Sequence, residues 1–477
     1  MSRTFIHVGT ALICLIALPG ARRAEAGGRA ESGSPARAGV DKKRPLPRCV
    51  IAPFDVGLVP RVSLNALRRP CARNNLGLAL GYARAGELRG LQIGLGAAAV
   101  DRAAVGVQVA LGVTAAGQGA AGLQLAGLVN AAGDDMVGIQ VAGLVNAAGE
   151  DMTGLQLAGL INAAGGNSFG PQIALLGNAA GKSAAVLQAG GLFNAAGKQV
   201  RGVQVAGLFN ASGEDMRGLQ IAGLFNASGG RAEAIQLGGL FNAASQLRGG
   251  QVAGAMNATE GGQGAQIALA YNRVYRELTG IQIAAVNVGR DVTGAQVGLV
   301  NIARRVDGVQ LGLVNVADRA SAPIGAVSWM RGGDRALEVW GGEALPLSAG
   351  VRLGTGRVYS LAGIASGPLV DGRPWGPAAG AGVKASFDRV ALLVDALGHV
   401  LFFDGVDDQA VLAQARARLA YDVTELLAVA AGATWNVFVS GDVDGEDLPL
   451  GPDSVDRSGD TTVRQWPGLL ASVALRF

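Results

Sequence analysis

The stretch GIQVAGLVNAAGEDMTGLQLAGLINAAGG, residues 138–166, contains the same sixteen-residue unit twice. Gln140 returns as Gln156, and Asn146 returns as Asn162. An active site needs each of its groups once, whereas a stack of similar layers needs the same group in every layer. The stretch therefore indicates a repeat architecture.

The repeat extends far beyond this stretch. Glutamines recur every sixteen residues from Gln92 to Gln236 and then at spacings of 15, 15, 16, 14 and 14 residues to Gln310, which makes fifteen units. A unit of this length is too short for two helices, but it can hold two short strands and two turns. We therefore expect an all-β chain with a parallel β-solenoid of about 15 coils, of 14–16 residues each, over residues 87–320.

Side chains at equivalent positions of stacked coils lie above one another, about 4.8 Å apart. Amide side chains can then bind one another along the stack, as in other stacked β structures. The sequence leaves open which way the amides face, because Leu123 and Leu125 flank Gln124 and also favour burial. The predicted ladder residues are Gln124, Gln140, Gln156, Gln204 and Gln220, with Asn130, Asn146, Asn162, Asn210 and Asn226.

One large transmembrane β-barrel that includes the repeats is the alternative fold. Residues 138–166 contain no aromatic residue, whereas transmembrane barrels carry aromatic girdles. The spacing from glutamine to asparagine also changes from six residues to five at Gln282. In a continuous strand this change would move one amide to the opposite face, whereas the corner of a solenoid can absorb it.

The composition changes after residue 320. All five tryptophans of the chain lie in residues 321–477. In the segment AVLAQARARLAYDV, residues 410–423, Gln414, Arg416 and Arg418 alternate with apolar residues. The chain ends in a similar alternating segment whose terminal Phe477 resembles the carboxy-terminal signal of bacterial outer-membrane barrels. We expect residues 321–477 to form an antiparallel β-barrel of eight to ten strands in the outer membrane.

The N-terminal region resembles an export signal followed by a linker. Residues 1–26 combine a positive charge, a short apolar run and a small-residue cleavage site, which predicts a signal peptide. Residues 27–86 would then form a linker and an N-terminal cap with a lead-in strand. In an exported protein, Cys49 and Cys71 predict one disulfide worth roughly 3 kcal/mol, although two unpaired cysteines remain the alternative.

Composition also restricts the classes of function. A net charge of +4 over 477 residues gives no electrostatic case for nucleic-acid binding. Once the signal peptide is removed, His399 is the one remaining histidine, so no metal site built from several histidines can form. We expect no enzymatic activity and no cofactor. The expected partner is the outer membrane, and any surface ligand is unknown.

The unit G-x-Q-x-G-x-x-N-x-A, the lead-in over residues 74–90 and the exit over residues 324–354 resemble a bacterial family of surface-repeat-containing proteins. That resemblance implies an exported, envelope-associated protein of a Gram-negative-type bacterium without enzymatic activity. Residues 296–303 and 310–317 also resemble curlin repeats, whereas most earlier units depart from that pattern. We expect a structural, display or adhesive role at the cell surface. The alternatives are a porin-like channel and a curli-like fibre subunit.

Overall fold

The structure is a computed structural model of the 477-residue chain. It describes residues 49–59, 62–64, 71–368, 370, 372–403, 408–441, 448, 453–458 and 461–477. The expected signal peptide and most of the expected linker lie outside the described residues. The chain divides into two compact units, Met1–Arg248 and Gly249–Phe477. Across the described ranges, no helix has the length and apolar character needed to cross a bilayer.

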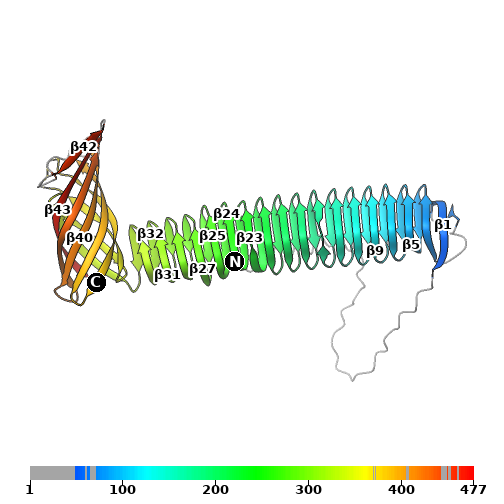
Figure 1. The fold of residues 1–477 in the computed structure, drawn as a ribbon, viewed down its shortest axis with the longest axis horizontal. Coiled ribbons are helices and arrows are strands. Elements are labelled where there is room, and N and C mark those ends of the chain that lie inside the picture. Colours follow the sequence, from blue (N-terminus) through cyan, green and yellow to red (C-terminus); the bar gives the residue numbers. More distant parts are fainter. Residues whose placement is uncertain are drawn as a thin grey trace, which may run out of the picture. The chain divides into compact units, whose positions relative to one another are not determined.

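The predicted fold class is confirmed: a parallel β-solenoid of about 16 turns precedes a closed antiparallel barrel of eight strands. Each coil of the first unit consists of a longer and a shorter strand. Figure 1 shows these strands stacked coil upon coil. The alternative of one large barrel that includes the repeats is wrong, because the repeats pair in parallel with the preceding and following coils.

The coil of Gln140 illustrates the register of the first unit. Its longer strand, β11 (Met136–Ala142), pairs in parallel with β9 (Ala120–Ala126) and β13 (Met152–Ala158), so that Gln140 lies between Gln124 and Gln156. The remaining strands of the first unit share this parallel stacking, apart from the antiparallel β2, and β1 extends it N-terminally. They are β1 (Val50–Val59), β2 (Val62–Ser63), β3 (Ala72–Ala79), β4 (Tyr82–Ala85), β5 (Glu87–Gly94), β6 (Ala97–Val100), β7 (Ala104–Ala110), β8 (Val113–Ala116), β10 (Val129–Ala132), β12 (Val145–Ala148), β14 (Ile161–Ala164), β15 (Ser168–Phe169), β16 (Gln172–Ala174), β17 (Gly177–Ala180), β18 (Ala184–Gly190), β19 (Phe193–Ala196), β20 (Val200–Ala206), β21 (Phe209–Ser212), β22 (Met216–Ala222) and β23 (Phe225–Gly238).

The interior of a coil is thin, because small side chains fill it. In the coil of Gln140 the buried apolar residues are Met136, Ala142 and Ala148. The stretch GEDMT, residues 149–153, predicts a turn from its glycine and acidic residues, but Met152 and Thr153 belong to strand β13, and Met152 is fully buried. The turn is therefore shorter than this pattern indicates, because the methionine side chain fills the end of the core.

A glycine lies two residues before thirteen of the fifteen ladder glutamines and allows the coils to stack closely. Gly138 has φ of 129°, and a Cβ there would lie 2.1 Å from the carbonyl oxygen of Gly122 in the preceding coil. Both the backbone conformation and the close approach therefore require glycine. Val186 occupies the same column with φ of 81°, a conformation that is strained for a β-branched residue.

The second unit contains further coils. β24 (Phe241–Ala253) runs into this unit. It is followed by β25 (Met256–Ala268), β26 (Tyr271–Val274), β27 (Glu277–Ile283), β28 (Val286–Val288), β29 (Asp291–Val297), β30 (Val300–Ile302), β31 (Arg305–Leu311), β32 (Val314–Ala317), β33 (Arg319–Ile324) and β34 (Val327–Met330). Parallel pairing thus starts before residue 87, at β1, and continues beyond residue 320, to β34.

The shorter coils keep their amides in register. Asn287, five residues after Gln282, pairs with Asn272 and Asn301 in the neighbouring coils. The glutamine strand β27 ends one residue after Gln282, at Ile283, whereas β11 ends two residues after Gln140, at Ala142. The corner after Gln282 therefore absorbs the change in spacing, as the sequence predicted.

The barrel follows β34 after three connecting residues. Its ring closes because β35 pairs antiparallel with both β36 and β43, and β42 pairs with β43 beside the ring. The strands are β35 (Asp334–Gly342), β36 (Leu347–Gly354), β37 (Val358–Ser366), β38 (Trp375–Phe387), β39 (Val390–Phe403), β40 (Asp408–Asp422), β41 (Leu427–Ser440), β42 (Ser454–Ser458) and β43 (Thr461–Arg476).

Candidate functional site: amide ladders and a charged barrel interior

The predicted glutamines form a ladder inside the solenoid. From Gln108 to Gln236, Nε2 of each ladder glutamine donates to Oε1 of the glutamine in the preceding coil, over 2.6 to 2.9 Å. Gln124, Gln140, Gln156, Gln204 and Gln220 all belong to it and are at most 2% exposed. The structure thus answers the question that the sequence left open, because the amides face inward.

The predicted asparagines form a second ladder of opposite direction. Asn146 Nδ2 donates to Oδ1 of Asn162 in the following coil over 2.9 Å, and also to the backbone oxygen of Leu157 over 2.8 Å. Asn130, Asn162, Asn210 and Asn226 donate in the same direction. The side-chain dipoles of the two ladders therefore oppose one another within each coil.

Other side chains terminate the asparagine ladder. Thr114 occupies the asparagine position one coil before Asn130, and its hydroxyl donates to Asn130 Oδ1 over 2.5 Å. At the other end, Asn315 Nδ2 donates to the backbone oxygen of Ile324 over 2.9 Å and lies 3.4 Å from Ser328 Oγ. These hydroxyl residues complete the hydrogen bonding of the terminal asparagines.

The glutamine ladder ends differently. Gln92 Nε2 donates to the backbone oxygen of Ala99 over 3.2 Å at the first coil. At the last coil Gln310 faces Pro323, which has no side-chain donor, and Gln310 Oε1 has no hydrogen-bond partner in the described structure. This ladder is therefore capped at one end.

The acidic turns do more than face solvent. Asp135 Oδ1 accepts a hydrogen bond from the backbone amide of Asp151 in the next coil, and Asp151 Oδ1 accepts one from the backbone amide of Asn167. The bond from the Asn167 amide holds the pKa of Asp151 below its usual range. The turn carboxylates thus link successive coils. Within the described residues, no group of three or more His, Cys, Asp or Glu side chains could hold a metal ion.

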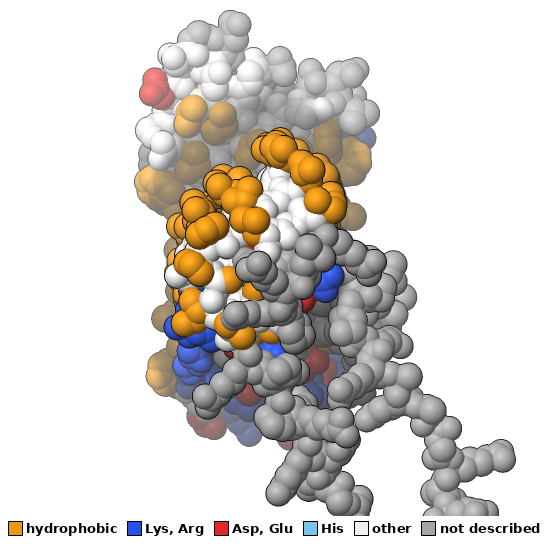
Figure 2. All heavy atoms as spheres, turned by 90° about the vertical axis from the view of Figure 1, so that its right-hand side faces the viewer, with side chains coloured by type: hydrophobic (Ala, Val, Ile, Leu, Met, Phe, Trp, Pro, Cys, Tyr) orange, Lys and Arg blue, Asp and Glu red, His pale blue; other side chains and the backbone are white. Residues whose placement is uncertain are grey.

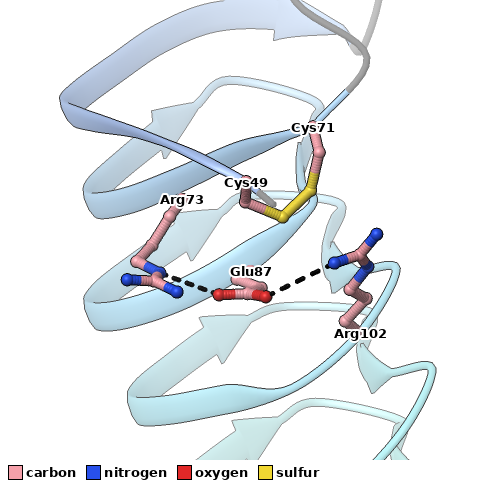
Figure 3. The surroundings of a disulfide bond; sticks show 5 residues. All are labelled: Cys49, Cys71, Arg73, Glu87 and Arg102. Atoms are coloured by element: carbon pink, nitrogen blue, oxygen red, sulfur yellow. Dashed lines mark hydrogen bonds and ion pairs between the residues drawn. A yellow bond between two sulfur atoms is a disulfide. The ribbon is translucent and has the colours of Figure 1, made fainter. Parts of the chain in front are cut away.

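The predicted disulfide joins Cys49 to Cys71, with their Cα atoms 4.7 Å apart (Figure 3). It ties the beginning of β1 to the residue that precedes β3. In the next coils Glu87 lies between Arg73 and Arg102, at 2.8 and 3.7 Å. The disulfide and these ion pairs together hold the first coils of the solenoid.

The barrel interior contains a network of charged side chains. Glu338 pairs with Arg352 over 3.0 Å and with Arg418. Arg418 also pairs with Asp395 over 2.7 Å, and Arg416 Nε donates to the same carboxylate over 2.5 Å. All five side chains are buried. The network connects opposite parts of the ring, because its members come from strands β35, β36, β39 and β40.

His399 lies next to this network and is 1% exposed. Its Nε2 lies 3.1 Å from Gln414 Oε1, and Gln414 Nε2 donates to Asn436 over 2.8 Å. The histidine therefore has a structural environment between strands.

The sequence identified only part of the barrel network. Gln414, Arg416 and Arg418 were correctly placed on one strand face, but Glu338, Arg352 and Asp395 were not identified as their partners. Each of these three is a single charge within an apolar strand, in ALEVW, GVRLG and LVDAL. That pattern indicates a charge that faces a closed interior. Their pairing depends on how the strands are staggered around the ring.

No protein-family model, no curated protein and no solved structure matches this chain.

Proposed function

We propose that this chain is a non-enzymatic envelope protein whose C-terminal barrel spans a bacterial outer membrane and carries the solenoid as a structural, display or adhesive module. The inverted distribution of side chains in the barrel carries the proposal. A network of buried charged side chains shares the interior with apolar clusters, whereas large apolar residues cover the outside. A barrel in water would present polar side chains on its outside, whereas lipid-facing barrels are apolar outside and polar within.

The outer surface of the barrel is apolar along its long strands. Exposed side chains on β39, β40 and β43 include Val394, Leu419, Leu469 and Val473. These strands have 14, 15 and 16 residues, more than the roughly 9–11 that a transmembrane strand requires. The barrel therefore has the length as well as the surface for a bilayer.

The interior supports an anchor rather than a porin-like channel. An eight-stranded barrel has a lumen that side chains can fill. Here Trp340, Trp466, Arg416 and Arg418 are buried within it. A channel would require this network to rearrange, whereas an anchor gains rigidity from it.

The chain offers less support for a curli-like fibre subunit. Stacking of one subunit on the next would require a free solenoid edge at both ends. The last coil continues through residues 331–333 directly into β35. The resemblance to surface-repeat proteins likewise supports an envelope location.

Gel mobility tests the anchor. We expect the full chain to require detergent for solubility and, in a detergent gel, to migrate differently before and after boiling. The variant Leu419→Arg should prevent stable insertion, because a cation on the lipid-facing surface costs about 2–4 kcal/mol near the bilayer midplane. Gln118→Arg, on an exposed turn of the solenoid, is the matched control and should insert normally. Recovery of the unmodified chain as a detergent-free soluble monomer would contradict the anchor.

Thiol labelling of intact cells tests display separately. Glu214→Cys places a thiol on an outer turn of the solenoid. Labelling by a membrane-impermeant maleimide would support exposure at the cell surface. If labelling requires permeabilised cells, the display and adhesive roles fail while the anchor stands.

A further inference from the structure

The solenoid has two unlike long edges. In the coil of Gln140, the corner between the two strands is Gly143-Leu144, whereas the turn to the next coil is Gly149-Glu150-Asp151. The same assignment of corner and turn repeats along the coils. One edge therefore collects the corners and the other collects the charged turns.

The corner edge is apolar throughout. Thirteen of the fifteen corners contain leucine, and none contains Asp, Glu, Lys or Arg. Six of these residues in the first unit form what we call the leucine ridge, and they are 38–48% exposed. The ridge consists of Leu128, Leu144, Leu192, Leu208, Leu224 and Leu240.

The strand faces next to the ridge extend its apolar surface. Outward residues beside the glutamines, such as Leu125 and Val205, are about two-fifths exposed. On the other strand, the rings of Phe193, Phe209 and Phe225 stack with centroids 5.6 and 5.1 Å apart. In the view of Figure 2, hydrophobic side chains gather on one side of the solenoid, and Lys, Arg, Asp and Glu gather on the opposite side.

The size of this surface indicates an interaction. The ten coils from Gln92 to Gln236, all within the first unit, span nine steps of about 4.8 Å, or roughly 43 Å. The largest apolar patch on a soluble monomer is typically about 300–600 Å² and is often functional. An apolar edge that runs along ten coils and is flanked by apolar strand faces is therefore a candidate interaction surface.

The form of the ridge fits a fluid partner better than a protein. A protein interface needs complementary shape and polar groups around an apolar centre. The leucine ridge lies along an edge of the solenoid, and leucine corners recur from coil to coil without a charged group to fix the register. A protein docked on it could slide by one coil and find the same contacts. Acyl chains need no register, and the charged turns would remain in water, as in an amphipathic helix at a membrane surface.

The barrel would bring the solenoid near a bilayer, and this step rests on the membrane anchor proposed above. Only residues 331–333 separate β34 from β35. A barrel in the membrane therefore holds the end of the solenoid close to lipid and raises the effective lipid concentration around it. We propose that the leucine ridge docks against the surface of a lipid bilayer, with its leucines among the acyl chains and its charged turns in water.

Site-directed fluorescence on the full chain tests this docking. In a Cys14→Ser background, with Cys49 and Cys71 paired, single cysteines replace Leu144 or Leu208 on the ridge. Glu150→Cys and Glu214→Cys, in the turns of the same coils, are the matched controls. Each variant is labelled with an environment-sensitive dye and reconstituted into phosphatidylcholine vesicles. A Val394→Cys variant reports whether the barrel itself is in lipid.

We expect several-fold stronger quenching by spin-labelled lipid at the ridge sites than at the turn sites, and the reverse order with aqueous iodide. Equal iodide quenching at ridge and turn sites would overturn the docking. Protection of the ridge from both quenchers, with energy transfer between chains that rises with protein density, would show a second copy there and also overturn it. If Val394→Cys is not quenched by lipid, the anchor fails. If it is quenched while the ridge is not, the anchor stands and the docking fails.

A charge variant provides an independent readout. Leu144→Glu together with Leu208→Glu changes only exposed side chains, so the solenoid should fold. We expect iodide quenching of a dye at Leu224→Cys to rise several-fold in that background, because the carboxylates hold the ridge in water. Unchanged quenching would contradict the proposal.

Discussion

Replacing Asn162 by aspartate removes hydrogen-bond donors from the asparagine ladder with almost no change in shape. Asn162 Nδ2 donates to Asn178 Oδ1 over 2.9 Å and to the backbone oxygen of Ile173 over 2.8 Å. An ionised carboxylate would face both acceptors without a proton to share. Each buried acceptor left without its donor costs about 1–3 kcal/mol. We therefore expect Asn162→Asp to lose roughly 2–6 kcal/mol of local stability at neutral pH, in addition to the cost of burying the charge.

The loss should depend on pH in a defined direction. Burial among acceptors raises the pKa of the new carboxyl in the folded chain above its unfolded value of about 3.9. The folded state then binds more protons, so stability falls as pH rises from the unfolded pKa to the folded pKa, by up to about 1.4 kcal/mol per pH unit. The new carboxyl, when it is neutral, can still donate one hydrogen bond. Between pH 4 and pH 6 we expect Asn162→Asp to lose up to about 2.7 kcal/mol relative to the unmodified chain.

Hydrogen exchange of strands β12 to β17 measures this loss locally, which suits a repeat array whose coils can open separately. Gln118→Glu makes the same amide-to-acid change on an exposed turn and should leave the exchange of β8 and β9 unchanged. Asn162→Ala should destabilise the same strands by an amount that does not depend on pH. Equal protection of Asn162→Asp at pH 4 and pH 7, relative to the unmodified chain, would refute the assignment of Asn162 as a buried donor.

Three further predictions concern strain, the cap and the barrel. Val186→Gly should raise the local stability of β18 by about 1 kcal/mol. The reason is that relief of about 1–3 kcal/mol of backbone strain exceeds the roughly 0.5–1 kcal/mol entropic cost of glycine. Slower hydrogen exchange of β18 would support this, and faster exchange would contradict it. Replacing Cys49 and Cys71 together by serine should cost roughly 3 kcal/mol and expose β1 to proteolysis, whereas unchanged proteolysis would show that the ion pairs suffice. Glu338→Gln should lower the unfolding temperature of the barrel, measured by its gel mobility after heating, since loss of one partner in a buried ion pair costs about 3–5 kcal/mol. An unchanged unfolding temperature would mean that Asp395 alone compensates the charge of Arg418.

Most of the fold could be predicted from the periodicity of the sequence. The sixteen-residue spacing from Gln92 to Gln236 predicted parallel stacking, and the alternation around Arg416 predicted the barrel strands. Both patterns are local, and each follows from the direction in which successive side chains point along a strand.

The inward direction of the amides could not be predicted from hydrophobicity. Leu123 and Leu125 are more apolar than Gln124, so hydrophobicity alone favours burial of the leucines, and the sequence left the direction of the amides open. The structure buries Gln124 because the space between the walls accepts alanine, methionine and paired amides. Ala126, two residues after Gln124, has the same orientation and is the signal that could have decided the question. The ion pairs of the barrel could not be predicted for another reason. Glu338 and Arg418 are 80 residues apart in the sequence, and local patterns do not specify how the strands of a closed ring are staggered.

The opposed amide ladders, and the hydroxyl caps of the asparagine ladder, have a consequence for how such a chain can change its length. Every coil between Thr114 and Ser328 presents the same donors to one neighbour and the same acceptors to the other. A whole coil can therefore be duplicated or deleted in this region without creating a new kind of contact, because the caps stay where they are. A change of one or two residues can be absorbed at a corner, as in the shorter coils, but the loss or gain of half a coil would shift the glutamines and asparagines out of register. Tandem duplication of one unit can thus lengthen the solenoid while the N-terminal cap and the barrel remain the same.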